Sequence, residues 1–164
     1  MVVRRAVVAD AAAIAGVHTR TWQAAYEHVF GAERLAAIDV SRRVAGWERG
    51  LAAGETVFVA EDGGWIVGFA SVGASRDLEG VGELYAIYAL PEAWGTGAAA
   101  ALAQAGVAAL RNAGFAEAVL WVLEDNPRAR RFYEREGWIL DGGRKEDEFL
   151  GVCVPEVRYR ITLG

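Results

Sequence analysis

The stretch AAAALAQAGVAALRNAG, residues 98–114, does most to limit the folds open to this chain. Its composition favours a helix that Gly114 is placed to end. The helix is apolar almost all round, since Gln104 is the only polar residue before Arg111. A helix without a polar face must be buried on several sides, so the chain needs other elements packed around it.

Strand patterns precede and follow this helix. Residues 82–90 (GELYAIYAL) and 115–124 (FAEAVLWVLE) are largely apolar on both faces, which is typical of inner strands. Residues 56–73 predict two strands joined in a hairpin around Gly63 and Gly64. The chain therefore combines a sheet with helices.

The first fifty residues read as one short strand followed by helices. Residues 2–7 predict the strand, and Asp10 stands where the N-cap of a helix over residues 11–29 belongs. Ser41 is placed to cap another helix, and a turn of helix is expected near residues 33–38.

The last forty residues predict a helix and two strands. Asn126 and Pro127 begin a short helix that Gly137 ends, and residues 138–143 then form a strand. The charged run RKEDE, residues 144–148, is expected to be a solvated loop. Residues 148–163 complete the sheet with one long strand, in which Cys153 is expected to be a small core residue.

The composition is that of one ordinary domain. The chain has 164 residues, is 54% hydrophobic and contains no repeat or linker, so we expect one α+β domain over residues 1–164. Its 17 basic and 22 acidic residues are mixed along the sequence. Without a basic stripe, nucleic acid is not an expected partner.

The same counts exclude several other classes of protein. A single cysteine cannot form an internal disulfide, which favours a reducing cytoplasm, and no Cys and His spacing resembles a metal site. No run of ~18 apolar residues is free of charge, so no membrane span is expected. Asp10 interrupts the first apolar stretch, which argues against a signal peptide.

The glycines before the buried helix suggest a phosphate-binding loop. WGTGAAAALAQ lacks the Lys and the Ser or Thr that a Walker loop needs. Gly95, Gly97 and Ala100 do match a dinucleotide-binding fingerprint, and Glu124 ends the next strand. However, PEAW separates the strand from the glycines, and the remaining chain is too short for a second nucleotide-binding half.

A more general anion site survives these tests. Gly95 and Gly97 let the backbone turn its amides inward, and a helix that begins near Ala98 directs free N–H groups and its positive end at the same place. Alanines at positions 98, 99 and 100 leave room there for a bulky anion. A plain glycine turn into a buried helix would have the same sequence.

Together with its flanks, the segment resembles the acetyl-CoA site of the GNAT-type N-acetyltransferase superfamily. There a bulged strand leads through a Pro-containing turn to [Q/R]-x-x-G-x-[G/A], which is matched here from Trp94 to Ala99 except that Trp94 replaces Gln or Arg. The second signature, an Asn and then a short helix with Phe-Tyr and Gly plus an aromatic, is matched by NPRARRFYEREGW, residues 126–138. The likeness is strong over residues 82–142 and weaker before them.

The resemblance implies a fold and a cofactor site. It implies a mixed, mostly antiparallel sheet of six or seven strands with about four helices, whose splayed central strands hold acyl-CoA. It also implies that Asn126 contacts the CoA arm as well as capping its helix. The other implied acetyl-CoA-binding residues are Ile87, Tyr88, Ala89, Trp94, Gly95, Thr96, Gly97, Ala98, Ala99 and Ala100.

Two residues are candidates for acid–base chemistry. Tyr133 stands about two helical turns after Asn126 and, by the resemblance, protonates the CoA thiolate; spacing alone would also fit a buried helix face. Glu83 opens the strand beside the acetyl group, where some family members carry a catalytic Glu. A charged strand end for Glu83, Glu79 as the base, or an ordered water as the base are the alternatives.

The implied activity is acetyl transfer to an amine. We expect direct attack by a primary amine of a small molecule or peptide on the thioester of acetyl-CoA. His18, Trp22 and Tyr26 form a stripe at i, i+4 and i+8, and Trp22 and Tyr26 are the candidates for contact with the acceptor. The alternative is a CoA-binding sensor without catalysis, which Trp94 favours. The resemblance further implies a homodimer.

Overall fold

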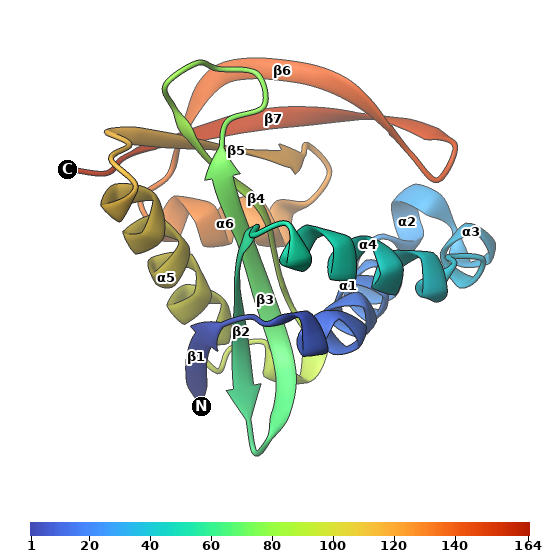
Figure 1. The fold of residues 1–164 in the computed structure, drawn as a ribbon. Helices are drawn as coiled ribbons and strands as arrows, with labels where there is room; N and C mark the ends of the chain where they lie inside the picture. The colour runs from blue at the N-terminus through green and yellow to red at the C-terminus, as the bar shows by residue number, and fades with distance from the viewer.

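The computed structural model describes residues 1–164 as a seven-stranded sheet with helices on both faces (Figure 1). The strand order is β1-β2-β3-β4-β5-β7-β6, and β4 with β5 is the one parallel pair. The predicted α+β class and mostly antiparallel sheet are therefore confirmed. The strands are β1 (Val2–Arg5), β2 (Thr56–Asp62), β3 (Trp65–Ala74), β4 (Gly82–Ala89), β5 (Glu117–Leu123), β6 (Ile139–Phe149) and β7 (Val152–Thr162).

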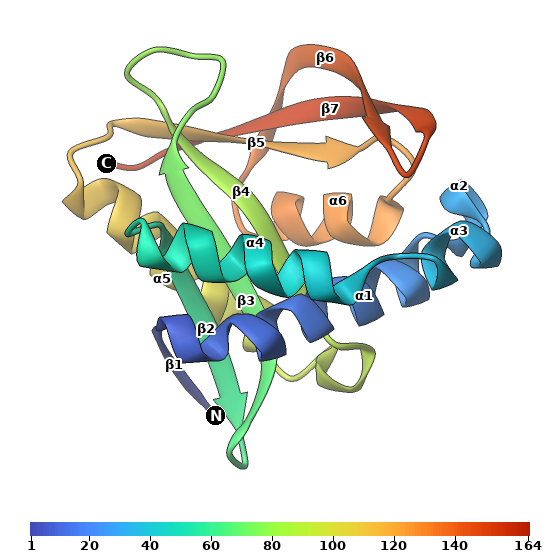
Figure 2. The ribbon, with the colours of Figure 1, turned by 45° about the vertical axis from the view of Figure 1, so that its right-hand side comes forward.

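The four longer helices divide between the two faces of the sheet. α1 and α4 lie side by side on one face, while α5 crosses the other, as Figures 1 and 2 show from two directions. α6 lies below β5 and β7 (Figure 2). The helices are α1 (Ala11–Ala25), α2 (Glu27–Phe30), α3 (Ala32–Ala36), α4 (Val40–Ala52), α5 (Ala98–Asn112) and α6 (Pro127–Arg135), with 3₁₀ turns at Val8–Asp10 and Pro91–Ala93.

Alternation along the strands builds a separate core on each face. Phe69 of β3 packs in a cluster with Ile14 and Val17 of α1. The next residue, Ala70, belongs to the cluster that contains Leu102 of α5. Because successive side chains of a strand point to opposite faces, the largely apolar strands β2, β3 and β4 contribute to both cores. α5 is less buried than the sequence predicts: one stripe is buried, and most of the other residues are only partly buried.

β4 and β5 pair only at their beginnings. Their register joins Gly82 to Ala118 and Glu83 to Val119, and no further pair forms. In β4, Tyr85 is an extra residue opposite the β3 step from Ser71 to Val72, so the strand carries a bulge there. Beyond it the two strands diverge, and the β4 backbone on the β5 side lacks a ladder partner.

Two N-terminal caps differ from the prediction. The Asp10 side chain does not cap α1; its carboxylate accepts hydrogen bonds from the Arg4 guanidinium and from the Val7 N–H. α4 begins one residue before Ser41, and Asp39 caps it by accepting from the Arg42 N–H at 3.2 Å. In the first case other donors occupy the predicted cap, and in the second a neighbouring Asp replaces it.

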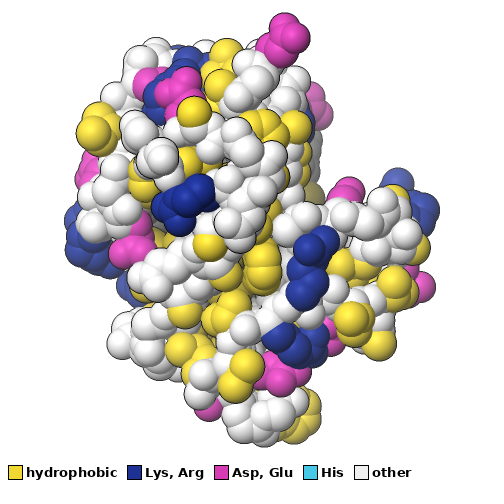
Figure 3. Space-filling model, turned by 60° about the vertical axis from the view of Figure 1, so that its left-hand side comes forward, with side chains coloured by type: hydrophobic (Ala, Val, Ile, Leu, Met, Phe, Trp, Pro, Cys, Tyr) yellow, Lys and Arg dark blue, Asp and Glu magenta, His cyan; other side chains and the backbone are white.

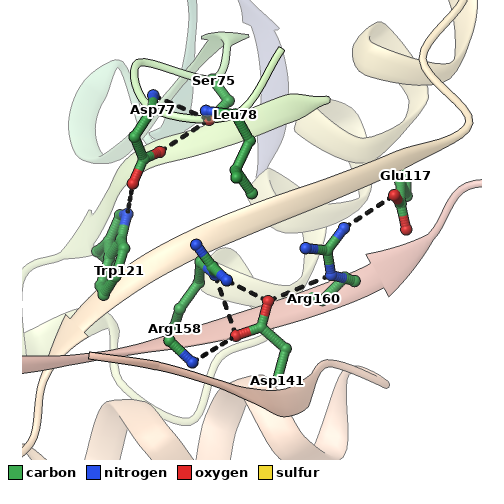
Figure 4. A network of polar contacts seen from close by, with 9 residues as sticks. Ser75, Asp77, Leu78, Glu117, Trp121, Asp141, Arg158 and Arg160 are labelled. Atoms are coloured by element: carbon green, nitrogen blue, oxygen red, sulfur yellow. Dashed lines mark hydrogen bonds and ion pairs between the residues drawn. The ribbon is translucent and has the colours of Figure 1, made fainter. Parts of the chain in front are cut away.

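The C-terminal hairpin also differs from the prediction. Residues 144–148 are not a loop but part of β6, which continues to Phe149, and the chain turns at Leu150 and Gly151 into β7. Cys153, expected in the core, is exposed. A bulge follows Leu140, where Asp141 accepts hydrogen bonds from Arg158 and Arg160 of β7 (Figure 4). The ion pairs of Asp141 with the two arginines thus support the pairing of β6 with β7.

Candidate active site

A cleft of about 690 Å³ opens where β4 and β5 diverge. Its lining comes from α1, β4, the loop before α5, β5, α6 and the β6–β7 hairpin. On the face drawn in Figure 3, hydrophobic side chains lie in a hollow near the centre, with Lys and Arg side chains at its margins. The splayed strands therefore create a cavity in the middle of the sheet.

The glycine loop presents free backbone amides at one side of this cleft. Gly95 and Gly97 have φ of 78° and 88°, a conformation that favours glycine, and α5 begins directly after Gly97. The N–H groups of Gly97, Ala99 and Ala100 make no hydrogen bond within the chain. Free amides at the positive end of a helix bind phosphates, so the loop fits the pyrophosphate of CoA.

Two neighbours of these glycines contribute differently from what the sequence suggested. The Thr96 hydroxyl donates to the Ala93 carbonyl and accepts from the Ala98 N–H, and the Ala98 side chain is fully buried. Neither residue lines the cleft, whereas Trp94, Gly95, Gly97, Ala99 and Ala100 do. Thr96 and Ala98 therefore shape the loop from behind.

Trp94 carries a cation on its ring. Its indole Nε1 donates to the Ala89 carbonyl at 2.9 Å, which fixes the ring against the end of β4. The Arg128 guanidinium of α6 lies 3.9 Å from the ring centroid, and both residues line the cleft. The Arg128 guanidinium therefore places a positive charge beside Trp94, the residue that stands where the motif has Gln or Arg.

β4 and α6 form a further part of the cleft wall. Ile87, Tyr88 and Ala89 all line it, on the part of β4 whose backbone is free toward β5. Asn126 caps α6 by accepting from the Ala129 N–H at 3.2 Å and donates to the Tyr26 hydroxyl at 3.1 Å. Asn126 therefore links α6 to the end of α1.

Tyr133 has a buried ring and an available hydroxyl. The side chain is 8% exposed and lines the cleft, and its hydroxyl makes no hydrogen bond within the chain. Burial raises the pKa of Tyr133 above its usual value, with a smaller contribution from nearby Tyr88. The hydroxyl thus keeps its proton at neutral pH and can donate it into the cleft.

Comparison with known proteins decides which family this site belongs to. The model of the "Acetyltransferase (GNAT) family" matches residues 16–138. The chain belongs to the GNAT acetyltransferase family. It is therefore an acetyl-CoA-dependent N-acetyltransferase.

Individual relatives agree with this assignment. The uncharacterized N-acetyltransferase YuaI of Bacillus subtilis is 38% identical over 76% of this chain and 73% of its own length. The uncharacterized N-acetyltransferase Rv2669 of Mycobacterium tuberculosis is 34% identical over 82% of this chain and 86% of its own. A phosphinothricin acetyltransferase from Sinorhizobium meliloti, solved with acetyl-CoA, has the same fold, with a TM-score of 0.76 at 21% identity over 99% and 88% of the two chains.

Within this GNAT domain, Glu83 lies outside the cleft. Its carboxylate is 0% exposed, does not line the cavity, and accepts hydrogen bonds from the Arg76 N–H at 3.1 Å and from the Arg76 guanidinium. Glu83 also sits in the last register pair that joins β4 to β5, before the strands separate. This placement does not favour Glu83 as the base. Glu79, the weaker candidate, is exposed and lies outside the cleft as well.

The loop that carries Arg76 is fixed above β5. Ser75 and Asp77 exchange hydrogen bonds within it, and the Trp121 Nε1 of β5 donates to the Asp77 carboxylate at 3.2 Å (Figure 4). Arg76 itself lines the cleft while it pairs with Glu83. The loop therefore places Arg76 in the wall of the GNAT cleft.

The stripe predicted on α1 does line the cleft. Trp22 and Tyr26 are buried, pack edge-to-face with ring centroids 5.2 Å apart, and form part of its wall with Phe149 of β6. His18 stacks on Tyr88 at 5.4 Å, and burial, helped by the charge of Arg43, lowers the pKa of His18 to about 3. His18 is therefore neutral at physiological pH.

Three ionisable residues of the β6–β7 hairpin, missed from the sequence, also line this end of the cleft. They are Lys145 and Asp147 of β6 and Glu156 of β7. The prediction placed the two β6 residues in a solvated loop, which hid their position. Glu156 left no signal in the sequence, because it alternates with Val157 in the same way as Arg158 and Arg160 alternate with the apolar residues that follow them.

Other findings concern metal ions and membranes. No group of three or more His, Cys, Asp and Glu residues is placed to hold a metal ion. No helix is both long and apolar enough to cross a membrane.

Proposed function

We propose that this acetyltransferase moves the acetyl group from acetyl-CoA to a primary amine by direct attack of the amine nitrogen on the thioester. The observation that carries the proposal is the single cleft between β4 and β5, which joins the glycine loop at one side to the aromatic wall of α1 at the other. One cavity therefore lets the two substrates meet without a covalent enzyme intermediate.

Each side of the cleft has a role in this reaction. The amides of Gly97, Ala99 and Ala100 bind the pyrophosphate of CoA. Arg128, held on Trp94, supplies the positive charge beside it. The free backbone of β4 near Ile87, Tyr88 and Ala89 hydrogen-bonds the pantetheine arm and polarises the thioester carbonyl.

Tyr133 acts as the acid. When the C–S bond breaks, the Tyr133 hydroxyl gives its proton to the thiolate of CoA. A thiolate with a pKa near ~8.5 can also leave unassisted, so Tyr133 accelerates this step and is not indispensable for it. The unpartnered hydroxyl of a buried tyrosine in the cleft supports this role.

The test combines ligand binding and turnover on the intact chain. Acetyl-CoA should raise the melting temperature and NAD should not, and free thiol should appear when acetyl-CoA is incubated with a panel of primary amines. Binding without turnover across the panel would favour a CoA-binding module, for which Trp94 is the one supporting feature. Stabilisation by NAD alone would contradict the proposal.

A further inference from the structure

We propose that Glu156 is the general base of this acetyltransferase and that it binds the ammonium group of a singly charged primary amine with an apolar body. The inference rests on the proposed function, because it assigns the second half of the same cleft. Four observations carry it: the position of Glu156, its lack of a partner, the balance of charges around it, and the walls beside it.

The sheet register brings Glu156 to the place where the strands separate. β4 and β5 are in register at Glu83 and Val119, so Ile87 and Leu123 lie four residues further along each strand. Across β5, Leu123 is the register partner of Glu156 on β7. Glu156 therefore lies beside the part of β5 that has separated from β4, and it lines the same cleft as Ile87 and Tyr88.

Glu156 is a buried residue whose carboxylate has no partner within the chain. The residue is 6% exposed, yet its side chain makes no hydrogen bond or ion pair within the chain. The other buried acidic residues have Arg partners: Arg4 for Asp10 and Arg76 for Glu83. Buried carboxylates are rarely left without a partner, so one that lines a cleft is suited to a cationic ligand.

The charges around Glu156 balance without it. Lys145 and Asp147 on β6 carry opposite charges, and Arg76 is paired with Glu83. Burial, with contributions from Asp147 and Glu83, raises the pKa of Glu156, while Lys145 and Arg76 oppose this rise. One negative charge therefore remains unmatched, and a single ammonium group would neutralise it.

The walls beside Glu156 favour an apolar body on the amine. Trp22, Tyr26 and Leu123 belong to one buried cluster with Val154, and Phe149 packs against it. Trp22, Tyr26, Leu123 and Phe149 also line the cleft. Because Arg76 is paired with Glu83 and Lys145 is balanced by Asp147, a second ammonium group on the ligand would find no other unmatched negative charge here. The site therefore suits an aralkyl or alkyl monoamine better than a polyamine.

With Glu156 as the base and Tyr133 as the acid, every proton of the reaction is accounted for. The ammonium group gives one proton to the Glu156 carboxylate, and the neutral amine attacks the carbonyl carbon, forming the C–N bond. Collapse of the tetrahedral intermediate breaks the C–S bond, and Tyr133 protonates the sulfur. The amide nitrogen loses its second proton to the Tyr133 phenolate, and Glu156 releases its proton to solvent, so both residues are regenerated.

The experiment compares Glu156→Gln with Glu146→Gln, a matched charge change at an exposed site of β6 outside the cleft. With acetyl-CoA and 2-phenylethylamine as probes, we expect kcat/KM to fall about 100-fold in Glu156→Gln and to stay unchanged in Glu146→Gln. Both variants should keep the melting-temperature rise that acetyl-CoA gives the parent chain. Glu156→Asp should recover part of the lost rate.

Two further readouts separate a base from a structural residue. The parent kcat/KM should fall toward acid pH as Glu156 is protonated, and Glu156→Gln should lose that part of the profile. The Gln variant should also be impaired less with 2,2-difluoro-2-phenylethylamine, whose fluorines lower the basicity of its amine. A purely structural role would change neither the pH profile nor the dependence on amine basicity.

The outcomes distinguish this inference from the proposed function. Failure of the parent chain to release thiol with every amine would refute the proposed function itself. An active parent with an equally active Glu156→Gln variant would overturn the role of Glu156 alone. Faster turnover of putrescine or glycine than of 2-phenylethylamine would overturn the assigned class of acceptor.

Discussion

Replacement of His18 by Phe should make the protein less sensitive to acid. His18 lies among four aromatic rings, stacked on Tyr88 and edge-on to Trp22, Trp47 and Phe69, with centroid distances between 5.4 and 6.1 Å. Burial there lowers the pKa of His18 from 6.5 to about 3, and the charge of Arg43 adds to this effect. The folded protein therefore keeps His18 neutral where an unfolded chain would protonate it.

The sign and size of the effect follow from this difference in pKa. Between pH 6.5 and about pH 3 the unfolded chain binds a proton at His18 that the folded chain does not, so stability falls as the pH is lowered. At pH 5 the cost is about 2 kcal/mol relative to pH 7.5, from the linkage relation for these two pKa values. In a domain of this size, that is a fall of roughly 4–8 °C in Tm.

The assay measures urea unfolding of both chains at pH 7.5 and at pH 5. His18→Phe should lose about 2 kcal/mol less stability than the parent between the two pH values, because all other ionisable groups are the same in both. His18→Gln serves as a second, polar variant that does not titrate. An equal loss in the parent and both variants would show that His18 is protonated in the folded state and would refute the reasoning.

Three other substitutions test separate parts of the site. Tyr133→Phe should leave the thermal shift with acetyl-CoA intact and lower kcat at least tenfold at neutral pH; an unchanged kcat would remove the acid role from Tyr133. Arg128→Ala should weaken acetyl-CoA binding about tenfold or more by titration calorimetry and lessen its dependence on salt, whereas equal affinity would exclude a phosphate contact by Arg128. Gly97→Ala should cost about 1–2 kcal/mol of unfolding free energy, because φ at this position is 88°, and no loss would argue against a left-handed residue there.

The sequence predicts the fold well where local patterns and buried elements agree. The glycines at 95 and 97, the apolar helix after them and the capped helix after Asn126 form as predicted. These features depend on residues close together in the chain, and each has a physical cause that a sequence displays, such as a left-handed turn or a missing polar face.

The predictions fail where strand pairing or a competing side chain overrides the local pattern. Residues 144–148 are as polar as a loop, yet the pairing of β6 with β7 holds them in a strand. At the helix ends, Arg4 and Val7 occupy the Asp10 carboxylate, and Asp39 caps α4 in place of Ser41. Periodicity within one segment does not reveal such competition.

The position of the general base could not be predicted from the pattern of one strand either. On β4 alone, Glu83 looks well placed, because it begins the strand beside the thioester. However, the strands are still paired at Glu83, and Arg76 returns over it from the preceding loop. The cleft is lined by β4 from Leu84 onward, and the buried glutamate that also lines it is Glu156 of β7, the register partner of Leu123. Sheet order, which places β7 directly beside β5, therefore decides which glutamate can meet the amine.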